Sequence, residues 1–159
     1  MSYSSSTVLI IVLNGVGLPM RIIPPWIADK VGQLNMFVPT LFAMSIIAYG
    51  WLGVNSIGGL YGFTVIYGLF NGAFQCLMPS TIASVTPNLN MIGTRLGMAF
   101  ALLSIAALTG PPIGGAIQSL MGGSYVGAQV YAAAFGTFGA ILILFSRVAK
   151  TGWTLRVKA

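Results

Sequence analysis

The sequence has very few charged side chains and lacks residue types on which most catalysis depends. Its 159 residues include one side-chain carboxylate, Asp29, and no histidine, and charged residues make up 5% of the chain. Soluble domains carry about 25% charged residues, so this chain does not have the charged surface of a soluble protein. Without histidine, paired carboxylates or a cluster of metal ligands, the sequence predicts neither an enzyme nor a metal site.

Cysteine is also scarce. Cys76 is the single cysteine, so no disulfide can form within the chain. It lies in an apolar stretch, where a thiol usually acts as a small packing residue. Seven basic residues give a net charge of +6, but they are scattered and no recognition motif accompanies them. We therefore expect no nucleic-acid partner.

Apolar side chains are abundant instead, at 57% of the sequence, together with 21 glycines. This composition is typical of a helical protein that crosses a membrane several times. A membrane-spanning helix needs about 20 mostly apolar residues. Five segments meet this requirement, approximately Thr7–Trp26, Met36–Val54, Leu60–Val85, Ile92–Gln118 and Gln129–Val148. The expected fold is an all-α integral membrane protein, a five-helix transmembrane bundle in a lipid bilayer, with a tail at 149–159.

The basic residues indicate an orientation. Arg21 and Lys30 flank the first break, Arg95 follows the third, and the second and fourth breaks carry no charge. The remaining cations cluster at the C-terminal end, namely Arg147, Lys150, Arg156 and Lys158. All seven thus fall on one side of a five-span topology, which the positive-inside rule makes cytoplasmic. We expect the N-terminus outside and the C-terminus in the cytoplasm, in the plasma membrane or, alternatively, in a vacuolar or other organelle membrane.

The C-terminal cations have a simple interpretation as a topology signal and as contacts to anionic lipid, with Trp153 as an interfacial anchor. An odd number of spans with an outside N-terminus is unusual for a complete protein. We therefore expect that a further segment precedes this sequence in the whole protein.

Small residues recur at four-residue spacing in most of the expected spans. In lipid, close backbone approach through small residues drives helix association. The pattern therefore predicts a tightly packed bundle. The residues are Gly58/Gly62, Gly68/Gly72, Gly93/Gly97, Gly110/Gly114 and Ala132/Gly136/Ala140.

The break after the first span carries a motif. Ala28-Asp29-Lys30-Val31-Gly32 resembles the loop signature Gly-x-x-x-Asp-Arg/Lys-x-Gly-Arg/Lys of the major facilitator superfamily. Asp29, Lys30 and Gly32 match in register, whereas Pro25 replaces the first glycine and Gln33 replaces the last basic residue. The alternative is an ordinary surface turn, for which Gly32 would supply the backbone freedom.

A second motif lies in the fourth span. Gly110-Pro111-Pro112-Ile113-Gly114-Gly115 resembles the Gly-Pro-x-x-Gly-Gly signature in the fifth helix of many proton-coupled members of that superfamily, whose pseudo-equivalent is the eleventh helix. The resemblance implies a functional kink or packing site. A glycine and proline kink without a functional role is the alternative.

The wider pattern resembles the C-terminal half of fungal monocarboxylate-permease-like proteins. It comprises Arg21 eight residues before Asp29, the stretch from Tyr67 to Phe74, and Gly93-Thr-Arg95-Leu-Gly97-Met98. The resemblance implies helices eight to twelve of a twelve-helix secondary active transporter of small monocarboxylates or similar organic solutes. It implies no cofactor and leaves proton coupling open. Because five helices cannot enclose a site between two halves, we expect no transport by this chain alone and a complementary transporter half as its partner. The alternative is a non-transporting split or degenerate half that assembles with, or regulates, a full-length transporter.

Arg21 is the main candidate for binding an organic anion, because the resemblance implies an arginine there that holds the substrate carboxylate. An arginine inside a span costs about 2.5–3.5 kcal/mol even on the lenient scale, and a guanidinium can hold a carboxylate with two hydrogen bonds. The family often has an aspartate one turn earlier, where this chain has Gly17. Alternatively, Arg21 reaches the headgroups from near the end of its span.

Two further groups of polar residues complete the candidate sites. Tyr67, Asn71 and Gln75 repeat at four-residue spacing and share one helix face, where they contact substrate or join helices. Asp29 and Arg95 both lie on the expected cytoplasmic side. We hypothesise that Asp29, with Arg95 or with a helix N-terminus, forms a latch that holds one transporter conformation.

Overall fold

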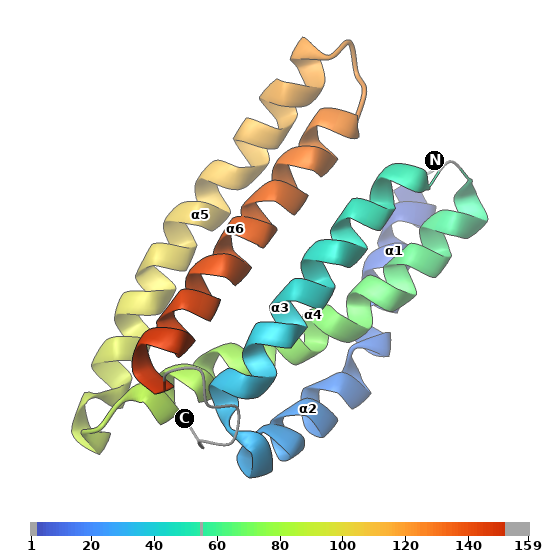
Figure 1. The fold of residues 1–159 in the computed structure, drawn as a ribbon. Coiled ribbons are helices and arrows are strands. Elements are labelled where there is room, and N and C mark those ends of the chain that lie inside the picture. Colours follow the sequence, from blue (N-terminus) through green and yellow to red (C-terminus); the bar gives the residue numbers. More distant parts are fainter. Residues whose placement is uncertain (1–2, 55, 152–159) are drawn as a thin grey trace.

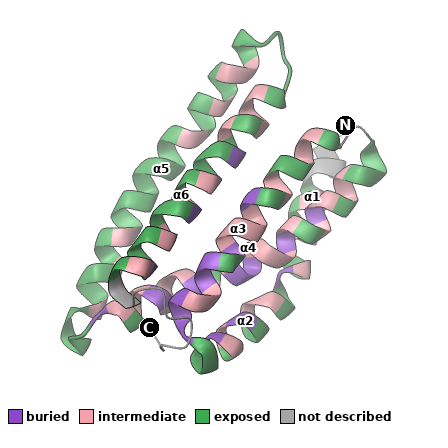
Figure 2. Cartoon of the chain, in the orientation of Figure 1, coloured by how far each residue is buried: buried purple, intermediate pink, exposed green. Residues whose placement is uncertain are grey.

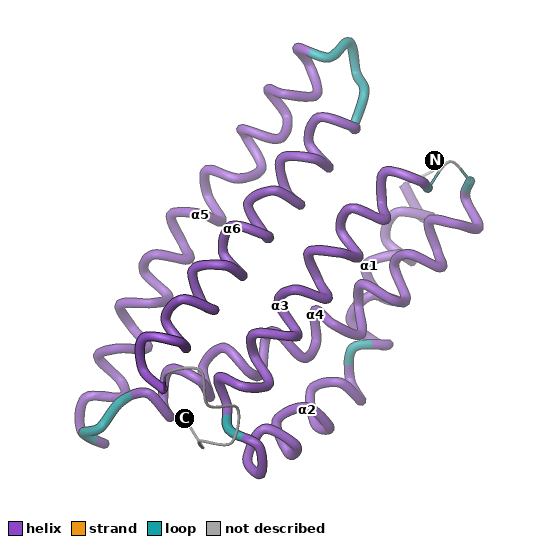
Figure 3. The backbone as a smooth tube through the Cα atoms, in the orientation of Figure 1, coloured by secondary structure: helices purple, strands orange, loops and turns teal. Residues whose placement is uncertain are grey.

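The computed structural model describes residues 3–54 and 56–151, and this part of the chain is helical without a strand (Figure 3). Asn55 and residues 152–159, including Trp153, Arg156 and Lys158, lie outside the described residues. The elements in chain order are α1 (Tyr3–Val16), α2 (Leu18–Val31), α3 (Gln33–Gly50), η1 (Trp51–Gly53), α4 (Ile57–Val85), η2 (Leu89–Met91), α5 (Ile92–Leu120) and α6 (Val126–Thr151).

Within the described residues, five helical segments are long and apolar enough to cross a membrane, which confirms the all-α, five-helix prediction. They are Thr7–Val31, Gln33–Gly53, Ile57–Val85, Leu89–Leu120 and Val126–Ala149. Helices α5 and α6 form a pair beside the group made by α1 to α4 (Figure 1). The ends of α2 and α6 and the start of α5 lie at the same end of the bundle, the lower end in Figure 1. We call this the basic end, because Lys30, Arg95 and Arg147 lie there.

The first break is shorter than the sequence indicates. Asp29 and Lys30 belong to the last turn of α2, and α3 begins at Gln33, so that Gly32 alone interrupts the helices. The expectation of a loop from Asp29 onward is therefore wrong. The physical reason is that a single residue makes the turn. Gly32 has a backbone φ of 106°, a value that residues other than glycine rarely adopt.

The first span is itself interrupted at Gly17, between α1 and α2. Pro19 lies in the first turn of α2 and has no backbone N–H to continue the hydrogen bonds of α1. Gly17 also lies against α4. A Cβ atom on Gly17 would stand 2.9 Å from the carbonyl oxygen of Gly68, and one on Gly68 would stand 2.7 Å from that of Leu13. A Cβ atom on Gly72 would meet the carbonyl oxygen of Gly17, so the Gly68/Gly72 pair packs two backbones together.

The core lies where α2, α3 and α4 meet. It consists of Ala28, Phe37, Ala73 and Leu77, and Leu77 is fully buried. Phe37 and Phe74 stack with their ring centroids 5.8 Å apart. This core fixes the basic end of α2 against α4 and thereby positions the polar residues of the site.

Helix α5 has no buried residue along its whole length (Figure 2). The prediction that all five small-residue pairs pack helices is therefore wrong. Ala140 is fully buried on α6, and Gly136 faces the hydroxyl of Ser45. A Cβ atom would meet nothing within 4 Å in three other pairs, Gly58/Gly62, Gly93/Gly97 and Gly110/Gly114. These glycines lie on faces that the described helices leave uncovered.

The Gly110–Gly115 motif lies within α5, which runs unbroken through Pro111 and Pro112. Both prolines are exposed, and a Cβ atom on Gly114 or Gly115 would also meet nothing within 4 Å. Among the described residues this motif packs no helix closely, so any packing role depends on a partner outside the described chain.

Candidate functional site

Arg21 lies deeper in its span than the sequence indicates. It is ten residues before Val31, the last residue of the span Thr7–Val31, or about 15 Å from that end at 1.5 Å per residue. Helical side chains also tilt toward the N-terminus of their helix, which here points away from the basic end. This depth argues against the alternative in which Arg21 extends to the headgroups at that end.

The guanidinium of Arg21 joins α2 to α4 and keeps hydrogen-bonding capacity. Its Nη2 donates to Oε1 of Gln75 at 3.1 Å. Its Nε is buried and has no hydrogen-bond partner among the described residues. A buried donor without a partner costs about 1–3 kcal/mol, so an acceptor that reaches this N–H would be held favourably.

The other two candidates on α4 have different surroundings. Tyr67, Asn71 and Gln75 lie along one face, next to the Gly68/Gly72 contact with Gly17. Gln75 contacts Arg21, but no described contact joins Arg21 to Tyr67 or Asn71. Tyr67 instead stacks on Phe63 with centroids 5.5 Å apart. The structure thus brings Arg21 and Gln75 together and leaves Tyr67 and Asn71 beside them on the same helix.

An aromatic stack extends from Tyr67 toward the end of the bundle opposite the basic end. Its other members, Phe63 and Trp51, were not predicted from the sequence. Phe63 stacks on both Tyr67 and Trp51, in each case with centroids 5.5 Å apart. The four-residue spacing of Phe63 and Tyr67 is a signal that could have predicted their contact. The contact with Trp51 depends on how η1 meets α4, so the spacing of residues within one helix cannot predict it.

Asp29 makes a different contact from the one expected. Its Oδ1 accepts a hydrogen bond from Nε2 of Gln33 at 2.8 Å. Lys30 places its Nζ 3.6 Å from the ring centroid of Trp26, a cation–π contact. Among the described residues Asp29 forms no ion pair with Arg95, so the form of the latch that pairs these two residues is not closed in this structure. The form with a helix N-terminus stays a prediction. The interaction with Gln33 spans one helical turn across Gly32 and ties the end of α2 to the start of α3.

Arg147 is buried rather than directed to lipid. It is 7% exposed, and its Nε donates to Oδ1 of Asn35 at 2.7 Å. Asn35 in turn donates from Nδ2 to the carbonyl oxygen of Val31 at 2.8 Å. The interpretation of Arg147 as a lipid contact is therefore wrong, because the start of α3 supplies a polar partner. Arg147 instead joins α6 to α3 at the basic end.

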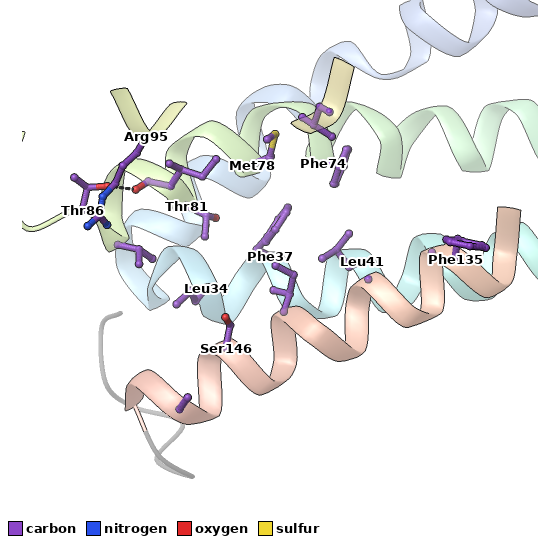
Figure 4. A pocket seen from close by; sticks show the side chains of 17 residues that line it. Leu34, Phe37, Leu41, Phe74, Met78, Thr81, Thr86, Arg95, Phe135 and Ser146 are labelled. Carbon is purple, nitrogen blue, oxygen red and sulfur yellow. Dashed lines mark hydrogen bonds between the residues drawn. The ribbon is translucent and has the colours of Figure 1, made fainter. Parts of the chain in front are cut away.

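A groove of about 810 Å³ lies between the α3/α4 and α5/α6 pairs. Arg95 lines it at the basic end, and Phe135 lies toward its other end (Figure 4). None of Arg21, Tyr67, Asn71 and Gln75 lines this groove. This groove is therefore separate from the predicted substrate residues.

Comparison with known proteins identifies relatives over nearly the whole chain. No protein-family model matches the chain, and no solved structure matches it. An MFS-type transporter of Gibberella zeae is 34% identical over 148 residues, covering 93% of this chain and 34% of the relative. MFS-type transporter 1 of Ophiocordyceps is 35% identical over 159 residues, covering 99% of this chain and 35% of the relative. An aspyridones efflux protein of Emericella nidulans is 34% identical over 142 residues, covering 89% of this chain and 29% of the relative.

The names of these relatives fit a chain with several helices that are long and apolar enough to cross a membrane. All three names describe a transporter or an efflux protein, and MFS stands for the major facilitator superfamily. The chain spans about one third of the length of these relatives. Over nearly its whole length this chain is therefore homologous to fungal transporters of the major facilitator superfamily.

Proposed function

We propose that this chain forms part of a secondary transporter that moves a small organic anion, a monocarboxylate or a similar solute, across a membrane. The names of the relatives support transport, and one of them is an efflux protein for an organic compound. In such transporters two groups of helices rock around a site near the middle of the bilayer. The chain would contribute five helices, as the C-terminal part of such a protein, and would need the remaining helices for activity.

The observation that carries the proposal is the depth and free bonding capacity of Arg21. A cation deep in a span normally faces a cavity or a partner, and the Nε of Arg21 has no partner among the described residues. Gln75 holds the other side of the guanidinium. A carboxylate is the group that a guanidinium recognises best, because two N–H groups can bind its two oxygens.

The break at Gly17 strengthens the case for an anion. Helix α2 begins at Leu18, one turn before Arg21. The N-terminus of a helix carries a partial positive charge, and interrupted helices in transporters direct such ends at anionic substrate groups. Arg21 and the start of α2 would thus attract the same negative charge.

Coupling and orientation belong to the same proposal. The single side-chain carboxylate of the sequence, Asp29, lies at the basic end in contact with Gln33. An acid that carries a proton near Arg21 would therefore come from the rest of the transporter. Lys30 lies near the end of α2, Arg95 near the start of α5 and Arg147 near the end of α6. These helix ends lie at the basic end (Figure 1), and their positive charge supports a cytoplasmic location for it. The plasma membrane is the proposed location, with a vacuolar or other organelle membrane as the alternative.

Binding of a carboxylate and of its neutral amide tests the proposal. We would replace the matched segment of the Emericella nidulans efflux protein with this chain; we call the product the joined protein. Butyrate and lactate should raise its melting temperature, and butyramide and lactamide should not. Arg21→Gln should weaken anion binding about ten- to a hundredfold, since a hydrogen bond to a charged group contributes about 1.5–3 kcal/mol.

Matched variants make the result specific. The anion affinity of Arg21→Lys should fall between that of the unchanged joined protein and that of Arg21→Gln. A lysine keeps the positive charge, but its ammonium group cannot bind both carboxylate oxygens in the paired geometry of a guanidinium. Lys30→Gln removes a cation from the same helix at its end, where Nζ contacts Trp26, and should leave binding unchanged. Equal stabilisation by acid and amide, or equal effects of Arg21→Gln and Lys30→Gln, would show that Arg21 does not bind the substrate anion.

The second candidate is a non-transporting half that assembles with, or regulates, a full-length transporter. The absence of any buried residue in α5 favours assembly with further helices in either case. The two functions differ in the joined protein: a transporter part would bind and move substrate there, whereas a regulatory half would change the activity of an intact relative with which it is co-expressed.

A further inference from the structure

We propose that the groove between the α3/α4 and α5/α6 pairs is the docking site of one further membrane-spanning helix, which brings an acidic side chain to Arg95. This inference rests on the proposed function, because the helix would belong to the part of the transporter that this chain does not contain. It goes beyond the proposed function by specifying where that part binds and which charge it carries.

The dimensions of the groove fit one face of a helix. Its lining on α6 runs from Phe135 to Ala149, which is about 20 Å along the helix axis. Spread over that length, the volume of about 810 Å³ gives a mean cross-section of about 40 Å². A helix with side chains is about 10–12 Å wide and has a cross-section of about 80–110 Å². The groove would therefore enclose about half of a helix and leave its other half to lipid or to another helix.

The walls of the groove suit helix packing in a membrane. Most lining side chains are apolar, with Phe37, Leu41 and Phe74 on the side of α3 and α4 (Figure 4). On α6 the lining includes Gly139, where a Cβ atom would meet nothing within 4 Å. Small residues in a wall permit close backbone approach, which holds helices together in lipid. The wall formed by α5 has no buried residue, so the described helices leave it uncovered.

The polar end of the groove indicates the charge of the partner. Arg95 lines the groove next to Thr86, with Thr81 further along α4 (Figure 4). Arg95 makes no hydrogen bond or ion pair with a described residue, and Asp29 is engaged by Gln33. Because the sequence has no other acidic side chain, a side-chain carboxylate that pairs with Arg95 has to come from another chain or segment. We therefore place an aspartate or glutamate near the basic end of the docked helix.

The relatives supply a source for that helix. This chain covers 93% of its own length but 34% of the Gibberella zeae transporter, and the shares for the Emericella nidulans efflux protein are 89% and 29%. About two thirds of each relative thus lies outside the match. A multi-helix remainder of this kind offers candidates for an apolar, membrane-spanning partner.

Site-specific photocrosslinking of the joined protein tests the docking site. p-Benzoylphenylalanine would replace Phe135, which lines the groove, and, as the matched control, Phe145 on the same helix, which does not. Both side chains are exposed, at 61% and 67%. Protease sites at the junctions would separate this chain from the rest after irradiation, and mass spectrometry would locate each crosslink.

The probe at Phe135 should link to one membrane-spanning segment of the efflux-protein part, and the probe at Phe145 should not link to that segment. Links from Phe135 to lipid, to a second copy of the joined protein or to nothing would overturn the proposal, as would equal links from both positions. Leu103 and Leu108 on α5 provide a second pair, since Leu103 lines the groove and Leu108 does not. Their use keeps the test available if a change at Phe135 prevents folding.

The charge is tested separately from transport. Arg95→Gln should lower the melting temperature of the joined protein and leave that of the chain alone unchanged, because the partner acid is present only in the former. An equal shift in both proteins would contradict the predicted pairing. If the joined protein fails to bind or move substrate but shows the Phe135 crosslink, the proposed function fails and the docking site stands.

Discussion

Arg147 and Asn35 show how a single buried contact organises the basic end. The guanidinium of Arg147 is almost completely buried and donates to Asn35, which also bonds to the end of α2 through the carbonyl of Val31. Polar groups in lipid are costly without partners. This contact therefore fixes α6 against the α2–α3 junction, where the Gly32 turn and Asp29 lie.

The coupling between these two residues can be measured with a double-mutant cycle. Arg147→Met and Asn35→Ala should show an interaction energy of about 1–2 kcal/mol in unfolding by SDS, in the range for hydrogen bonds in membrane proteins and to charged groups. The control pairs Asn35→Ala with Arg95→Met, since Arg95 has no described contact with Asn35. Additive effects of Arg147→Met and Asn35→Ala would mean that the contact does not stabilise the fold.

At this scale the sequence identifies some residues and misses others for physical reasons. The presence of Arg21 inside a span and the four-residue spacing of Asp29 and Gln33 are local properties that a sequence can reveal. The depth of Arg21 in that span depends on where α2 ends, which the sequence did not place correctly. The pairing of Arg147 with Asn35 joins residues 112 positions apart and depends on how α6 meets α3. Hydropathy and charge therefore suggested a lipid contact for Arg147, whereas tertiary packing buries it.

Helices α4 and α5 are both rich in glycine, yet they use it differently. On α4, Gly68 and Gly72 lie against the backbone at Leu13 and Gly17. On α5, the glycines face open space in the described chain. The spacing of small residues predicted close packing for both helices and could not distinguish them. The sequence of one helix face does not show whether another helix packs against it.

Leucine substitutions separate the two helices experimentally. Gly72→Leu should destabilise the chain by about 1–3 kcal/mol, because its side chain would force α4 away from Gly17. Gly97→Leu should leave the stability of the chain alone nearly unchanged, since nothing lies near that position. Thermal unfolding in detergent measures both effects. Similar losses for the two variants would contradict the packing described for α4.

The helix boundaries illustrate the limit of turn chemistry at the element scale. The number of apolar helices follows from hydropathy, because each needs about 20 residues to cross the bilayer. The polar residues Asp29 and Lys30 suggested a loop, but both remain helical because Gln33 and Trp26 satisfy them. Only Gly32 adopts a backbone conformation that ends the helix.

At the scale of the molecule, the described helices leave much apolar surface exposed. Helix α5 has no buried residue, and a groove is open between two helix pairs. Arg21 lies outside that groove, on the contact between α2 and α4. In the proposed transporter one further helix would fill the groove, and the remaining helices would enclose the substrate at Arg21.

Transport in proteoliposomes tests the central claim that this chain supplies an anion site to a larger transporter. Labelled butyrate and lactate would be offered to vesicles that hold the joined protein, its Arg21→Gln variant or the chain alone, with and without an imposed proton gradient. We predict saturable uptake by the joined protein, strong loss with Arg21→Gln, and no uptake by the chain alone. Saturable uptake by the chain alone, or undiminished uptake with Arg21→Gln, would contradict the account.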